Sequence, residues 1–175
     1  MHSITRELLA YLEEQRSILK SAFESVPPEA RDRPPAPERW SAANVVEHLA
    51  IVEGRISKLL SERIEEARAG LSPGTSADPI LPTIDYKRMY DRSVRVKAPE
   101  TAIPTGLDAG SAWTALESAG AKMQAMLVAN DGLDLSSVTH PHPRFGLLSV
   151  YQWVAFLGAH EVRHAEQIRE GLRSR

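Results

Sequence analysis

The sequence has no cysteine, which excludes disulfide bonds, thiolate metal ligands and a cysteine nucleophile together. It also lacks any apolar run approaching the roughly 20 residues that a membrane-spanning helix needs. The first residues, MHSITRELLAYLEEQR, carry charge throughout and offer no unbroken apolar stretch for a signal peptide. We therefore expect a cytoplasmic protein without a membrane partner.

An excess of positive charge is also missing. Lys and Arg total 21 against 23 Asp and Glu, a net charge of −2, so no electrostatic attraction to nucleic acid is predicted. A chain of 175 residues in which 42% are hydrophobic is long enough to bury a core of its own. We expect a single domain over residues 1–175.

Four stretches carry the apolar period of a helix, at residues 3–25, 41–69, 111–130 and from 149 almost to the C-terminus. Ser3 and Ser41 are suitable N-caps for the first two. Prolines fill the first connection, and five more (Pro73, Pro79, Pro82, Pro99 and Pro104) punctuate about forty residues between the second and third stretches. No set of alternating strands is evident. The pattern predicts an all-α fold, a four-helix bundle with one long proline-rich crossover, and a short helical turn near residues 86–91.

Residues 160–164 read HEVRH, with His160 and His164 one helical turn apart. Both lie in the middle of the apolar stripe that Trp153, Phe156 and Leu157 define, so we expect both to face the core. His48 lies at the edge of the stripe on the second helix. Two facing helices that supply one and two imidazoles predict a three-nitrogen metal centre with one open position. An all-nitrogen site suits a divalent transition metal, with Zn or Ni favoured, although ligand type also permits Fe, Co or Cu.

Other interpretations of these residues stay open. The three histidines could be core residues with ordinary hydrogen-bond partners. HEVRH also matches the HExxH signature of zincin metalloproteases. That reading needs a third ligand downstream, and Glu166 and Glu170 lie on the same predicted helix as the pair.

We interpret His140 and His142, in the segment THPHPRFG, as loop residues that cap the mouth of the site. Candidate catalytic helpers are Glu161 and Glu47, each adjacent to a ligand, and Asn44, one turn before His48; simple solvated helix positions are the alternative.

Two segments together carry a family resemblance. PERWSAANVVEHLA (37–50) resembles the second-helix motif of the DinB superfamily, and HPRFGLLSVYQWVAFLGAHEVRHAEQI (142–168) resembles its last helix. RVKAPETAIP (95–104) is loosely similar to its connector. The resemblance places that family's metal-binding histidines on His48, His160 and His164, and it implies a four-helix bundle that is often a dimer. Relatives include thiol transferases that use a low-molecular-weight thiol and a mycothiol-dependent isomerase. In these the metal would bind the thiol as thiolate and lower its pKa.

The resulting expectation is a metal-dependent enzyme, a thiol S-transferase or a hydrolase, that acts on a small electrophilic substrate. The alternative is a non-enzymatic stress-response bundle in which a metal or small ligand joins the helices. A homodimer is also expected, because two helices carry more apolar residues than one inward face needs. The crossover, roughly residues 70–110, could instead cover that surface within one chain. The additional apolar residues are Leu9, Tyr11, Ile18, Ala112, Ala115, Ala119 and Met126.

Overall fold

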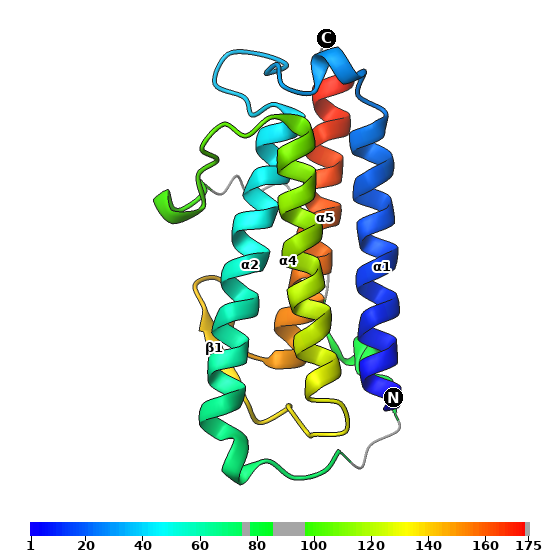
Figure 1. Cartoon of the computed structure of the whole chain (residues 1–175), viewed down its shortest axis with the longest axis vertical. Coiled ribbons are helices and arrows are strands. Elements are labelled where there is room, and N and C mark those ends of the chain that lie inside the picture. Colours follow the sequence, from blue (N-terminus) through cyan, green and yellow to red (C-terminus); the bar gives the residue numbers. More distant parts are fainter. Residues whose placement is uncertain (75–77, 86–96, 174–175) are drawn as a thin grey trace.

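The computed structural model describes residues 1–74, 78–85 and 97–173. Those residues form an all-α bundle of four long helices, with one small hairpin beside it (Figure 1). The predicted fold class is confirmed. The predicted helical turn at residues 86–91 lies outside the described residues. The bundle helices are α1 (Ser3–Glu24), α2 (Ala42–Ala67), α4 (Ala109–Ala129) and α5 (Val150–Arg173).

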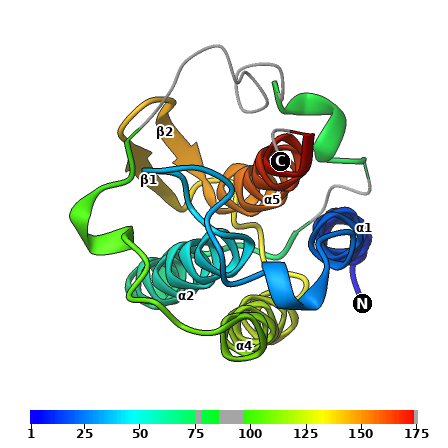
Figure 2. The same ribbon diagram turned by 90° about the horizontal axis from the view of Figure 1, so that it is seen from above.

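The directions of the helices explain the long crossover. In Figure 1, α1 and α5 run up the molecule and α2 and α4 run down it. Seen from above in Figure 2, α2 lies beside α4 and α5 beside α1, and these two pairs make the most extensive helix contacts. Because α2 and α4 are neighbours that point the same way, the chain must return along the whole bundle between them. Short 3-10 turns punctuate the connections, at Pro28–Ala30, Arg68–Gly70, Leu81–Thr83 and Glu100–Ala102.

The helix starts follow local hydrogen bonds. Ser41 caps α2 as predicted, and it forms a reciprocal capping box with Asn44. Ser3 does not cap α1 as predicted, because it is already the first helical residue and His2 before it makes no side-chain cap bond. Asp108 caps α4, which therefore begins slightly before the predicted position.

A two-stranded antiparallel hairpin precedes α5, and the sequence did not predict it. Strand β1 (Thr139–His142) pairs with β2 (Gly146–Ser149), with Thr139 opposite Ser149 and His142 opposite Gly146. Pro141 is tolerated because each strand of a two-stranded sheet has a free edge. Gly146 has φ +78°, a left-handed conformation that glycine adopts without strain.

Buried apolar residues form two clusters, one toward each end of the bundle. One includes Leu8 and Leu12 of α1 and Ile56 of α2; the other includes Leu19 of α1 and Leu49 of α2. Between them lies a layer in which polar and charged side chains replace the apolar ones. The buried polar members of this layer are Gln15, Glu47, His48, Glu53, Glu161 and His164.

The apolar residues that suggested a dimer are mostly inside the bundle. Tyr11, Ala112, Ala119 and Met126 are buried, and the Tyr11 hydroxyl donates to the carbonyl of Ala155 in α5. Leu9, Ile18 and Ala115 are partly buried against the core. The surface invoked for a partner is therefore largely covered by the chain's own helices. The homodimer stays a prediction, to be checked by light scattering against the chain mass of 19.3 kDa.

None of the described helices is long and apolar enough to cross a membrane.

Candidate metal centre

The bundle brings together the three histidines that the sequence singled out. His48 comes from α2, and His160 and His164 come from successive turns of α5. One ring nitrogen from each lies within 4.8 Å of the others, and the Nε2 atoms of His160 and His164 are 3.1 Å apart. His48 and His164 are buried, at 5% and 9% exposure. Among the described residues, His48, His160 and His164 form a group that could hold a metal ion.

Hydrogen bonds fix the orientation of two of the rings. The Nδ1–H of His48 donates to the carbonyl oxygen of Ala102, 2.7 Å away, in the 3-10 turn Glu100–Ala102. The Nδ1–H of His164 donates to Oε1 of Gln167 at 2.8 Å. Because both oxygens can only accept, the proton of each ring is on Nδ1 and the Nε2 atom carries a lone pair. Metal-ligating histidines are typically held this way.

The donor set fits a divalent transition metal. Tetrahedral bonds of about 2.0–2.1 Å place two imidazole nitrogens roughly 3.3 Å apart, close to the 3.1 Å between His160 and His164. Burial lowers the pKa of His48, although the hydrogen bond to Ala102 opposes the shift. Burial, and then the neighbouring His164 and His48, hold the pKa of His160 well below its usual value. At neutral pH His48 and His160 are therefore uncharged, as metal binding requires.

Aromatic rings pack against two of the histidines of the cluster. The indole of Trp40 lies 5.0 Å from the His48 ring, and Phe156 stacks on His160 at 5.3 Å. His142, on β1, packs against Phe156, with the ring centroids 4.7 Å apart. Phe156 therefore lies between the hairpin and His160 of the cluster. His140 lies against Trp153 instead. Neither belongs to the histidine cluster. The prediction that both are loop residues is wrong, because both lie on strand β1; their capping role remains a prediction.

A groove adjoins the cluster between the start of α2 and the end of α5. It is shallow, with a cavity volume of about 20 Å³. Trp40 and Gln167 lie in its wall, so the groove shares with the cluster the residues that contact His48 and His164. Its remaining lining is mainly apolar, with Arg39 as its cation; the lining residues include Val26, Pro35, Val45, Ile168 and Leu172.

The three predicted helpers all have other partners. Asn44 is occupied in the capping box of α2. Glu47 accepts four hydrogen bonds from residues 105–107, at 2.6–3.0 Å, and so holds the end of the crossover onto α2. Both oxygens of Glu161 accept from Arg16. A catalytic role for these residues remains a prediction on which nothing below depends.

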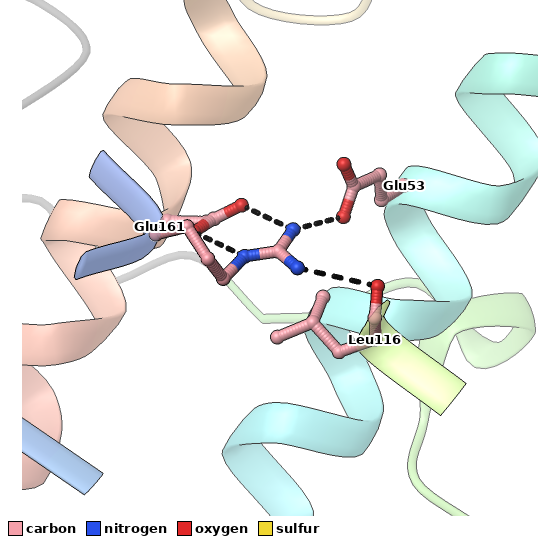
Figure 3. Close-up of polar contacts among 4 residues, drawn as sticks. Glu53, Leu116 and Glu161 are labelled. Carbon is pink, nitrogen blue, oxygen red and sulfur yellow. Dashed lines mark hydrogen bonds and ion pairs between the residues drawn. The ribbon is translucent and has the colours of Figure 1, made fainter. Parts of the chain in front are cut away.

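A buried ionic network beside the cluster was not predicted. Arg16 of α1 binds Glu161 of α5 at 2.8 and 2.9 Å and Glu53 of α2 at 2.7 Å (Figure 3). It also donates to the carbonyl of Leu116 in α4 at 3.3 Å, so one guanidinium joins all four helices. Burial raises the pKa of Glu53 to about 7, against the opposing effect of Arg16, and burial also raises the pKa of Glu161. The available sequence signal was that Arg16, Glu53 and Glu161 each interrupt an apolar stripe.

Comparisons with known proteins agree with this architecture. The uncharacterized protein YuaE of Bacillus subtilis is 28% identical over 147 residues, which cover 81% of this chain and 83% of that protein. The crystal structure of TT2238, a four-helix bundle protein, matches 95% of this chain and 98% of its own, with a TM-score of 0.62 and 19% identity. The latter likeness concerns the fold alone.

The sequence model of the DinB superfamily matches residues 11–168, a span that contains all three histidines of the cluster. The chain therefore belongs to the DinB superfamily.

Proposed function

We propose that this protein binds one divalent transition metal, Zn or Ni, through the Nε2 atoms of His48, His160 and His164. The proposal is carried by the hydrogen bonds of His48 to Ala102 and of His164 to Gln167, which place the proton of each ring on Nδ1 and leave Nε2 unprotonated within a converging cluster. Simple core histidines would instead use their hydrogen-bonding atoms on ordinary partners. The zincin alternative fits poorly, because the third histidine comes from the upstream helix α2 and Glu161 is bound to Arg16.

We further propose that the centre is catalytic, as a thiol S-transferase or a hydrolase that acts on a small electrophile. Three nitrogen ligands leave a position where a bound metal would act as a Lewis acid and lower the pKa of a thiol or water. The chain has no thiol of its own, so a thiol reaction would use an external low-molecular-weight thiol. The groove beside Trp40 and Gln167 adjoins the cluster, and Arg39 in its wall suits an anionic substrate.

Metal analysis tests the first part. Protein purified without an affinity tag is expected to contain near-stoichiometric metal, which a His160→Ala, His164→Ala double variant should lose. A His140→Ala, His142→Ala double variant is the matched control, because it removes two histidines outside the cluster and should keep the metal. Equal metal content in the wild type and the His160/His164 variant would overturn the proposal.

A second candidate function is structural. His48 and His164 are buried, and Ala102 of the crossover is hydrogen-bonded to His48, as expected for a metal that only joins helices. The spectrum of the cobalt-substituted protein distinguishes the two. A catalytic centre should change its visible absorption when azide or a panel of cellular thiols is added, because each can enter the open position. A spectrum that responds to none of them would favour the structural role.

A further inference from the structure

One ring nitrogen of the cluster lacks the partner that the other two rings have. The Nδ1 atom of His160 is buried and has no hydrogen-bond partner among the described residues. Its Nε2 faces His164, 3.1 Å away. If Nε2 holds a metal, the proton of the neutral ring must be on Nδ1. A buried N–H without an acceptor is destabilising.

A free acceptor lies across a small void from this nitrogen. This narrow space, which has no room for a water molecule, lies between α2 and α5 and is lined by Leu49, Glu53, Leu157, His160 and Glu161. Two of these side chains are carboxylates, but both oxygens of Glu161 accept from Arg16. Glu53 accepts from Arg16 through Oε2, as Figure 3 shows, and none of the described residues donates a hydrogen bond to its Oε1.

We propose that Glu53 is a positioning residue for the metal centre, whose free carboxylate oxygen accepts a hydrogen bond from Nδ1–H of His160. This inference rests on the proposed metal centre. Because the space between them has no room for a water molecule, the contact would be direct, made by a rotation of the carboxyl group that keeps Oε2 on Arg16. All three histidines then have an outer partner: a carbonyl, an amide and a carboxylate.

The charges of the network support this assignment. Arg16 carries one positive charge and binds two carboxylates, so the network with both ionised has a net charge of −1. Glu53 and Glu161 are each only 3% exposed, and a surplus charge there is poorly solvated. A divalent cation held by three neutral histidines offsets it. Arg16 also anchors Glu53 to α1, α4 and α5, which gives the acceptor a fixed place.

Three variants separate the hydrogen bond from the charge. Glu53→Leu removes both, whereas Glu53→Gln removes the charge and keeps an acceptor. Glu161→Gln is the matched control, because it removes one charge from the same network without removing the free oxygen. We expect Glu53→Leu to weaken Co(II) binding about 10- to 100-fold, measured by chelator competition. The two glutamine variants should weaken it clearly less. Equal affinities for Glu53→Leu and Glu161→Gln would overturn the proposal.

The wild-type protein provides a test that does not depend on a variant folding. In the ¹⁵N-labelled zinc-loaded protein, Nδ1–H of His160 should give a slowly exchanging downfield resonance with an Overhauser contact to the Glu53 side chain. A His160 ring coordinated through Nδ1, or a fast-exchanging Nδ1–H, would refute the assignment. If the wild type binds no metal at all, the proposed function fails; if it binds metal but the Glu53 effects are absent, only this inference fails.

Discussion

Each histidine of the cluster depends on a neighbour from a different part of the chain. Helical spacing was enough to predict that His48, His160 and His164 face inward, because apolar stripes fix the faces of long helices. Gln167 could also have been found, since it lies three residues after His164 on the same helix. The carbonyl of Ala102 could not, because no periodicity specifies the path of a proline-rich crossover. Glu53 was missed because a charged residue in a stripe says nothing of its partner.

The raised pKa of Glu53 predicts a pH effect on the metal-free protein. Burial raises this pKa from 4.5 to about 7. Between these values the folded state binds more protons than the unfolded state, so the free energy of unfolding falls as pH rises. Glu53→Gln removes this contribution, and its stability should decline less between pH 5 and pH 7.5 in urea titrations. Titrating groups outside the Arg16 network are common to both proteins, and their effects cancel in the comparison. An unchanged pH dependence in the variant would contradict the raised pKa.

At the scale of elements, the sequence predicted the four long helices and failed on the hairpin and on close contacts. Strands β1 and β2 have four residues each, and Pro141 and Gly146 interrupt any alternating pattern. The approach of α1 to α5 likewise leaves little trace in the sequence. Gly158 appears as a helix-weakening residue in an apolar stripe, but in the structure it lies directly under Tyr11 and Gln15.

Replacing Gly158 with alanine tests this helix contact. A Cβ atom there would lie 2.4 Å from Cε1 of Tyr11 and 2.9 Å from Cγ of Gln15, so α1 and α5 must move apart. Overpacking of this kind destabilises by about 1–3 kcal/mol, which opposes the roughly 1 kcal/mol that alanine adds in helix propensity. Gly54→Ala is the control, because the nearest atom to its new Cβ is 4.0 Å away. Thermal unfolding should show Gly158→Ala below the wild type and Gly54→Ala at or above it. A higher melting temperature for Gly158→Ala than for Gly54→Ala would contradict a close contact between α1 and α5 at Gly158.

At the scale of the whole molecule, the polar layer joins segments that are far apart in the chain. The histidine cluster links α2 to α5, and Ala102 attaches the crossover to it. The ionic network of Arg16 adds α1 and α4. A metal bound by the cluster therefore acts on α2 and α5, which are not consecutive in the sequence, and on the crossover through Ala102. Since the unfolded chain does not hold the three histidines together, metal binding favours the folded state.

The size of this linkage can be predicted. At a free metal concentration of about 100 times Kd, binding to the folded state alone adds roughly 2.7 kcal/mol. For a chain of this length that corresponds to a rise in Tm of about 5–11 °C. Zinc-loaded wild type should therefore melt higher than the same protein after chelation, whereas the His160→Ala, His164→Ala variant should melt at one temperature in both conditions. Hydrogen exchange should show the protection gained on metal binding at residues around His48, Ala102 and His164. A rise in Tm that persists in the double variant would mean that the metal acts elsewhere on the chain.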